Sequence, residues 1–134
     1  MTVDVGPRQS GKTTRLIDSV VEFLENNQDK SALIVAPLGD MRRLIVDKVK
    51  DRCGFCTERV ITSYKMLPPT RNSTIKQFVD EFSFLSDENL QIDFDAHYNG
   101  TLETSLMSTK KRLILEYYKK ENIKPKKVLP RHGL

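Results

Sequence analysis

The residues with the clearest chemistry lie near the start of the chain and follow the pattern G-x-x-x-x-G-K-T. They are Gly6, Pro7, Arg8, Gln9, Ser10, Gly11, Lys12 and Thr13. In such a loop, backbone N–H groups cradle a phosphate, the lysine reaches the β- and γ-phosphates, and the threonine hydroxyl ligates Mg²⁺. The pattern predicts a site for a nucleoside triphosphate, which we take to be ATP with Mg²⁺. Its phosphates would contact the loop and Thr14.

The flanking residues have the periodicities that position such a loop. Residues 2–5 alternate as a short strand, and from Thr14 onward apolar residues recur on one helical face. These apolar residues are Leu16, Ile17, Val20, Val21 and Leu24. A strand, loop and helix in this order also place the positive end of the helix dipole at the phosphate.

An acidic pair ends a second apolar segment, Phe78-Val79-Asp80-Glu81. We expect Asp80 to hold Mg²⁺ through water and Glu81 to orient or deprotonate the attacking water. An ordinary acidic turn is the alternative interpretation. Asp93 and Asp95 are the rival candidates, ranked second because they lack an adjacent glutamate and alternate along an expected strand.

Further strands and helices alternate along the chain. We expect strands at 32–36, 59–63, 75–79 and 90–94, the last ending near a turn at Asn99-Gly100. A helix after Gly39-Asp40 has Met41, Leu44, Ile45 and Val49 on one face, and a C-terminal helix spans about 108–120. This order predicts a three-layer α/β domain with a mostly parallel sheet, which binds ligands at the carboxyl ends of its strands.

Length and charge indicate one domain with a basic C-terminal extension. The chain has 134 residues and a net charge of +4, but residues 109–134 contain nine Lys/Arg and two Asp/Glu. We therefore divide the chain into a core at 1–108 and a basic helix and tail at 109–134. The basic part is a candidate contact for nucleic-acid phosphates, with a solvated helix and a frayed end as the alternative.

No apolar run is long enough to span a bilayer and no signal-peptide pattern is present, so we expect a soluble, cytoplasmic protein without a membrane partner.

The two cysteines, Cys53 and Cys56, have the C-x-x-C spacing of redox pairs and of half zinc sites. A tetrahedral zinc site needs two more ligands, and the only histidines are His97 and His132. We expect two reduced cysteines, with a metal site that includes His97 as the alternative.

Residues 2–105 together resemble the first RecA-like domain of helicase-type motors, and most closely the P-loop ATPase domain of viral large terminases. Arg8-Gln9 looks like the arginine-bearing phosphate loop of terminases, and the segment 32–37 looks like a helicase strand that precedes a DNA-contacting segment. Arg71-Asn72-Ser73 is similar to the lead-in to their acidic strand, and Asn99-Gly100-Thr101 lies where these motors have a coupling motif.

The resemblance implies an ATPase that acts on DNA, in viral DNA packaging or a helicase-like role in the host cytoplasm. Lys12 and Glu81 would be catalytic, and Arg8 would stabilise charge on the γ-phosphate in cis. Thr13 and Asp80 would serve the Mg²⁺. A homo-oligomer or a partner subunit would supply a further arginine in trans.

Two other functions fit parts of the pattern. Thymidine kinases also combine a Gly-Pro-x-x-Ser-Gly-Lys loop with an Asp-Glu pair, so a nucleoside or nucleotide kinase is the second hypothesis. A nucleotide-binding regulatory module, with the basic tail as its docking element, is the third. Glu81 argues against the module, because a protein that only binds nucleotide needs no catalytic base.

Overall fold

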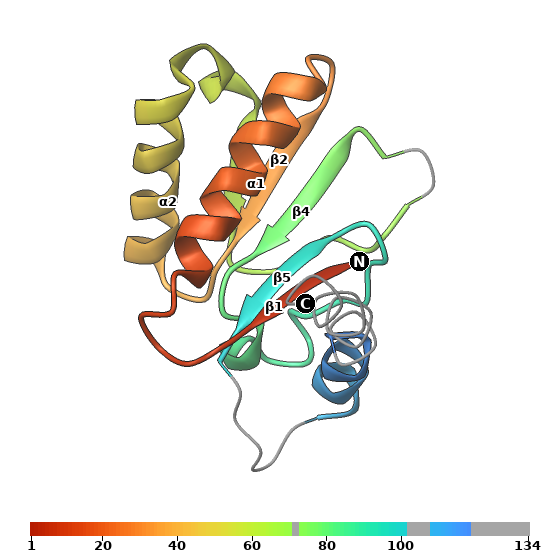
Figure 1. Ribbon diagram of the computed structural model, residues 1–134. Helices are drawn as coiled ribbons and strands as arrows, with labels where there is room; N and C mark the ends of the chain where they lie inside the picture. Colours follow the sequence, from red (N-terminus) through yellow and green to blue (C-terminus); the bar gives the residue numbers. More distant parts are fainter. Residues whose placement is uncertain (71–72, 102–107, 119–134) are drawn as a thin grey trace, which may run out of the picture.

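The centre of the protein is a five-stranded, entirely parallel sheet (Figure 1). The computed structural model describes residues 1–70, 73–101 and 108–118, with the backbone alone at 55–57. The strands are β1 (Thr2–Val5), β2 (Ser31–Val35), β3 (Val60–Ser63), β4 (Ile75–Val79) and β5 (His97–Gly100). They are arranged in the order β1-β5-β4-β2-β3, so β5 lies between β1, which leads into the loop at residues 6–13, and β4, which ends at the acidic pair. The expected α/β class and parallel sheet are confirmed.

Two helices cover one face of the sheet. They are α1 (Lys12–Asn26) and α2 (Gly39–Arg52), which is followed by the short helix η1 (Gly54–Arg59). The apolar stripe of α1 packs against β2, β4 and α2, and Leu16, Val20 and Leu24 are fully buried. In α2, Ile45 and Val49 are buried as expected, but Leu44 is 45% exposed, so the apolar face of this helix is narrower than the sequence suggests.

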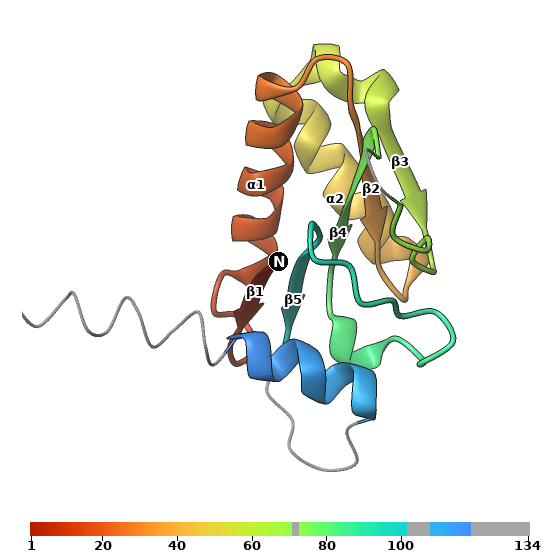
Figure 2. The ribbon, with the colours of Figure 1, turned by 90° about the vertical axis from the view of Figure 1, so that its right-hand side faces the viewer.

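The opposite face is covered by the chain that follows β4. It comprises η2 (Phe82–Phe84), an irregular segment through residue 96 and a helix over residues 109–118. This last helix (blue) lies on the far side of the sheet from α1 and α2, near β1 and β5 and away from the β3 edge (Figures 1 and 2). Ile114 anchors it in the second core cluster, which includes Val5, Val79, Phe82 and Tyr98. The described elements are therefore compatible with three layers.

The prediction of the fifth strand was wrong in position. Residues 90–94 form no strand, and the strand lies at His97–Gly100, where a turn was expected. The hydroxyl of Tyr98 donates to the Gln91 carbonyl and accepts from the Asp93 N–H, so the earlier segment folds back against β5. Gly100 pairs with Val5 of β1, and only glycine fits this position because a Cβ there would lie 2.5 Å from the ring of Phe82.

The region of the cysteines also differs from expectation. Cys53, just after α2, is buried and is disulfide-bonded rather than reduced. The side chain of Cys56 lies outside those described. Within the described residues, no group of three or more His, Cys, Asp or Glu side chains is placed to hold a metal ion.

Candidate functional site

The predicted phosphate loop, residues 6–13, connects β1 to the first turn of α1. Gln9 and Gly11 have positive φ angles of 58° and 84°, and Gly11 is the N-cap of α1. Glycine adopts the left-handed conformation at no steric cost, whereas Gln9 holds it against its usual preference. Arg15 fastens the loop from one helical turn further on, with its Nε 2.6 Å from Asp4 Oδ2 and its Nη1 2.8 Å from the Ser10 carbonyl.

Lys12 is turned inward and is only 5% exposed. Its Nζ donates to the carbonyls of Gly6 and Pro7, each at 3.0 Å, and to Thr101 Oγ1 at 3.3 Å. The same Nζ lies 3.4 Å from Glu81 Oε1. Oxygen atoms thus hold the ammonium group inside the loop. A phosphate bound in the loop would offer it further oxygen acceptors.

Asp80, directly after β4, meets Thr13 at the start of α1. Thr13 Oγ1 donates to Asp80 Oδ1 at 3.2 Å, and Asn99 Nδ2 donates to the same oxygen at 2.9 Å. Asp80 Oδ2 is buried and has no hydrogen-bond partner among the residues that the structure describes. Burial raises the pKa of Asp80, although the bonds from Asn99 and Thr13 oppose this shift. A buried carboxylate oxygen without a donor, beside a threonine hydroxyl, is the donor set expected of a Mg²⁺ site.

Glu81 leaves the line of the strand through a positive φ of 54°. Its N–H donates to Asn99 Oδ1 at 2.7 Å. Its carboxylate accepts from Thr101 Oγ1 at 3.1 and 3.2 Å and from Ser83 Oγ at 3.3 Å. A non-glycine residue in this conformation persists only where its surroundings fix it, and Asn99 supplies that constraint. The Glu81 side chain stays 23% exposed.

The structure shows hydrogen bonds of Asn99 and Thr101 that the sequence did not predict. Residues 99–101 lie where the resemblance implies a coupling motif, and in the structure Asn99 is fully buried and bonds to both members of the acidic pair. Thr101 links Lys12 to Glu81. Sequence reasoning missed Ser83, whose only signal is its position two residues after Glu81.

Lys12, Thr13 and Glu81 border one cavity of about 520 Å³. Its lining consists of the loop from Arg8 to Thr14, together with Glu81. Arg8 is exposed and is one of the residues that line this cavity. The cavity thus combines backbone amides, a lysine, an arginine and a carboxylate, a set that suits binding and hydrolysis of a phosphoanhydride.

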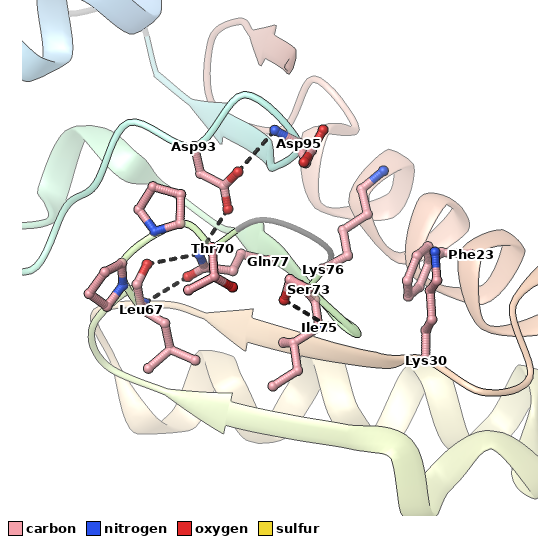
Figure 3. A pocket seen from close by; sticks show the side chains of 12 residues that line it. Phe23, Lys30, Leu67, Thr70, Ser73, Ile75, Lys76, Gln77, Asp93 and Asp95 are labelled. Carbon is pink, nitrogen blue, oxygen red and sulfur yellow. Dashed lines mark hydrogen bonds between the residues drawn. The ribbon is translucent and has the colours of Figure 1, made fainter.

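The rival acidic residues lie elsewhere. Asp93 and Asp95 border a different cavity, of about 680 Å³, whose lining includes no residue of the phosphate loop (Figure 3). Asp93 is buried; its Oδ2 accepts from Gln77 Nε2 at 2.9 Å and its Oδ1 from the Asp95 N–H at 2.9 Å. Gln77 also bonds to both the N–H and the carbonyl of Leu67. Asp93 therefore fixes the loops around this cavity, and its two carboxylate oxygens are already engaged.

Two lysines of the basic C-terminal segment donate hydrogen bonds to backbone carbonyls of the preceding chain. Lys110 Nζ donates to the carbonyls of Asp87 and Leu90, and Lys111 Nζ donates to the carbonyl of Ser83, at 2.7 to 2.8 Å. These two lysines fasten the helix over 109–118. The remaining basic residues of the tail, from 119 onward, lie outside the described residues.

In comparisons with known proteins, no family model, curated protein or solved structure matches this chain. In the part of the chain that the structure describes, no helix has the length and apolar character needed to cross a membrane.

Proposed function

We propose that this protein is a Mg²⁺-dependent P-loop ATPase of RecA-like type, which couples ATP hydrolysis to nucleic-acid binding or movement. One observation carries the proposal. Lys12 and Thr13 from α1 meet Asp80 and Glu81 from the end of β4, with 3.4 Å between Lys12 and Glu81 and 3.2 Å between Thr13 and Asp80. These residues are far apart in the sequence and have the types that phosphoryl transfer requires.

Binding begins with an exchange of partners at Lys12. Its ammonium group now donates to the Gly6 and Pro7 carbonyls and to Thr101. Phosphate oxygens of ATP would replace these neutral acceptors with anionic ones, which form stronger bonds with the ammonium group. Release of the Lys12 ion pair would also free the Glu81 carboxylate to face the γ-phosphoryl group.

Thr13 and Asp80 would hold the Mg²⁺, which when bound neutralises charge on the β- and γ-phosphate oxygens. Within the protein, Asn99 holds Asp80 Oδ1 at 2.9 Å and leaves Oδ2 free of hydrogen bonds from the described residues. This arrangement supports metal binding because the carboxylate is oriented before any ligand arrives.

Glu81 is the proposed base. It would accept a proton from the attacking water as oxygen bonds to the γ-phosphorus and the bond to the leaving ADP oxygen breaks. Thr101 and Ser83 donate to its carboxylate, and Asn99 fixes its backbone. Arg8 would stabilise charge on the transferring group from the rim of the same cavity.

The nucleic-acid part of the proposal has separate support. It rests on the resemblance to terminases and helicases and on the excess of lysine and arginine in residues 109–134. We place the protein in viral DNA packaging or a helicase-like role in the host cytoplasm. A second copy or a partner subunit would supply a trans arginine.

The test is steady-state ATP hydrolysis with Mg²⁺, with and without single- or double-stranded DNA. We expect a DNA-stimulated rate that Glu81→Gln abolishes while ATP binding is retained. Phosphate transfer to thymidine instead of water would replace the proposal with a nucleoside kinase. Tight ATP binding without turnover under every DNA condition would favour the regulatory module.

A further inference from the structure

A second cavity adjoins the 520 Å³ cavity at the predicted phosphate loop, which we call the phosphate cavity. It has a volume of about 500 Å³, and its described lining is Val5, Gly6, Pro7, Arg8, Thr101 and Tyr118. Arg8 borders both cavities, so the phosphate loop forms their common wall. Thr101 also connects them, because it accepts from Lys12 and donates to Glu81. A ligand bound in the second cavity would therefore lie next to the phosphates.

The chemistry of the two cavities differs. The residues that line the phosphate cavity are mainly polar and charged, whereas Val5, Pro7 and Tyr118 give the second cavity apolar and aromatic lining residues. No acidic residue is among its described lining residues. Apolar walls with a few polar groups suit a flat, uncharged group, and aromatic side chains stack on nucleobases of any sequence.

The Tyr118 ring is held by a well-anchored helix. Ile114, one helical turn earlier and on the same face, is fully buried in the core. Lys110 and Lys111 fasten the start of the helix to the carbonyls of Asp87, Leu90 and Ser83. Tyr118 is half-buried and also borders a third cavity, beside β1 and Arg15. Such support allows an aromatic side chain to act as a fixed stacking surface.

We propose that the cavity between Arg8 and Tyr118 is a nucleobase-binding subsite in which the base stacks on the Tyr118 ring. This inference rests on the proposed function, because the phosphate cavity must hold a nucleotide for the neighbouring subsite to matter. The base can come from the bound ATP or from a nucleic-acid strand. In both cases the ligand is a planar heteroaromatic base, and the experiment distinguishes the base of ATP from a base of the strand.

The chain contains no tryptophan, so Tyr118→Trp introduces a single fluorescent reporter at the subsite. The variant is titrated with MgATP, with Mg-tripolyphosphate and with a short oligodeoxyadenylate in the presence of saturating tripolyphosphate. We expect saturable quenching by at least one base-bearing ligand and none by tripolyphosphate alone. Quenching by ATP identifies the base of the nucleotide, and quenching by the oligonucleotide identifies a base of the strand.

Calorimetry on unlabelled variants keeps the test independent of the reporter. Tyr118→Ala should weaken binding of the quenching ligand roughly tenfold or more, while tripolyphosphate binds as before and Tyr118→Phe stays near the parent. Tyr117→Ala is the matched control, since Tyr117 packs on the same core and lines neither cavity. Unchanged affinity in Tyr118→Ala, with no quenching in Tyr118→Trp, overturns the subsite but leaves the proposed function intact. Failure of tripolyphosphate to bind the parent protein overturns both.

Discussion

Buried His97 makes the stability of this protein depend on pH in a way that one substitution should remove. The side chain is 5% exposed, and its ring lies 6.0 Å from that of Phe78 between ring centroids. Its Nε2 is buried without a hydrogen-bond partner among the described residues. Burial lowers the pKa of His97 from 6.5 to about 4; nearby Asp4 opposes this shift and Lys76 adds to it.

The sign follows from the protonation of the two states. Between pH 6.5 and pH 4 the unfolded chain binds a proton at His97 that the native protein does not, so the free energy of unfolding falls as pH falls. The difference between a pKa of 6.5 in the unfolded chain and about 4 in the native protein corresponds to about 3 kcal/mol. The loss should be complete near pH 4, and above pH 6.5 this residue should contribute no pH dependence.

Urea unfolding of the parent and of His97→Phe between pH 4 and pH 8 measures this effect. Phenylalanine keeps an aromatic ring beside Phe78 but cannot titrate, and His97→Gln serves as a second non-titrating variant. The difference in unfolding free energy between parent and variant should change by about 3 kcal/mol across this range. Carboxylates contribute equally to both proteins, so parallel curves would refute the assignment of a neutral, buried His97.

Three further substitutions test the packing and the candidate site. Gly100→Ala should lower the urea midpoint by the equivalent of about 1–3 kcal/mol, because the new Cβ would lie 2.5 Å from the buried Phe82 ring. Asn99→Ala should cost about 1–3 kcal/mol and slow ATP hydrolysis, since it removes the partner of Asp80 and of the Glu81 N–H; an unchanged turnover number would contradict the positioning role. Glu81→Gln should bind ATP at least as tightly as the parent in calorimetry, because it removes the carboxylate that pairs with the phosphate-loop lysine. Weaker binding would show that this ion pair does not compete with nucleotide.

Local patterns determined much of the architecture. The phosphate loop and its flanking strand and helix are consecutive in the chain, so sequence spacing alone predicts β1, the turn and α1. β2 was also predictable, because a strand buried on both faces reads as a short apolar run, and β3 and β4 were predicted close to their observed bounds. The acidic pair at 80–81 was found for the same reason, as it directly follows such a segment.

The position of β5 depended on tertiary structure. Residues 90–94 alternate in the manner of a strand and Asn99-Gly100 resembles a turn, so local propensity favours the wrong segment. Pairing with β1 on one side and β4 on the other, and the hydrogen bonds of the Tyr98 hydroxyl, place the strand at His97–Gly100 instead. Burial of all four strand residues outweighs the turn preference of two of them.

The sequence by itself determined which residues could bind phosphate and metal, because a short loop and a strand end carry their chemistry locally. Only the tertiary structure decided how those residues are held. Asn99 in β5 and Thr101 directly after it reach the acidic pair from 18 to 20 residues away, and the order β1-β5-β4 places them between the loop and that pair. Such contacts depend on which strands become neighbours, and that choice is made by burial of the whole sheet rather than by any one segment.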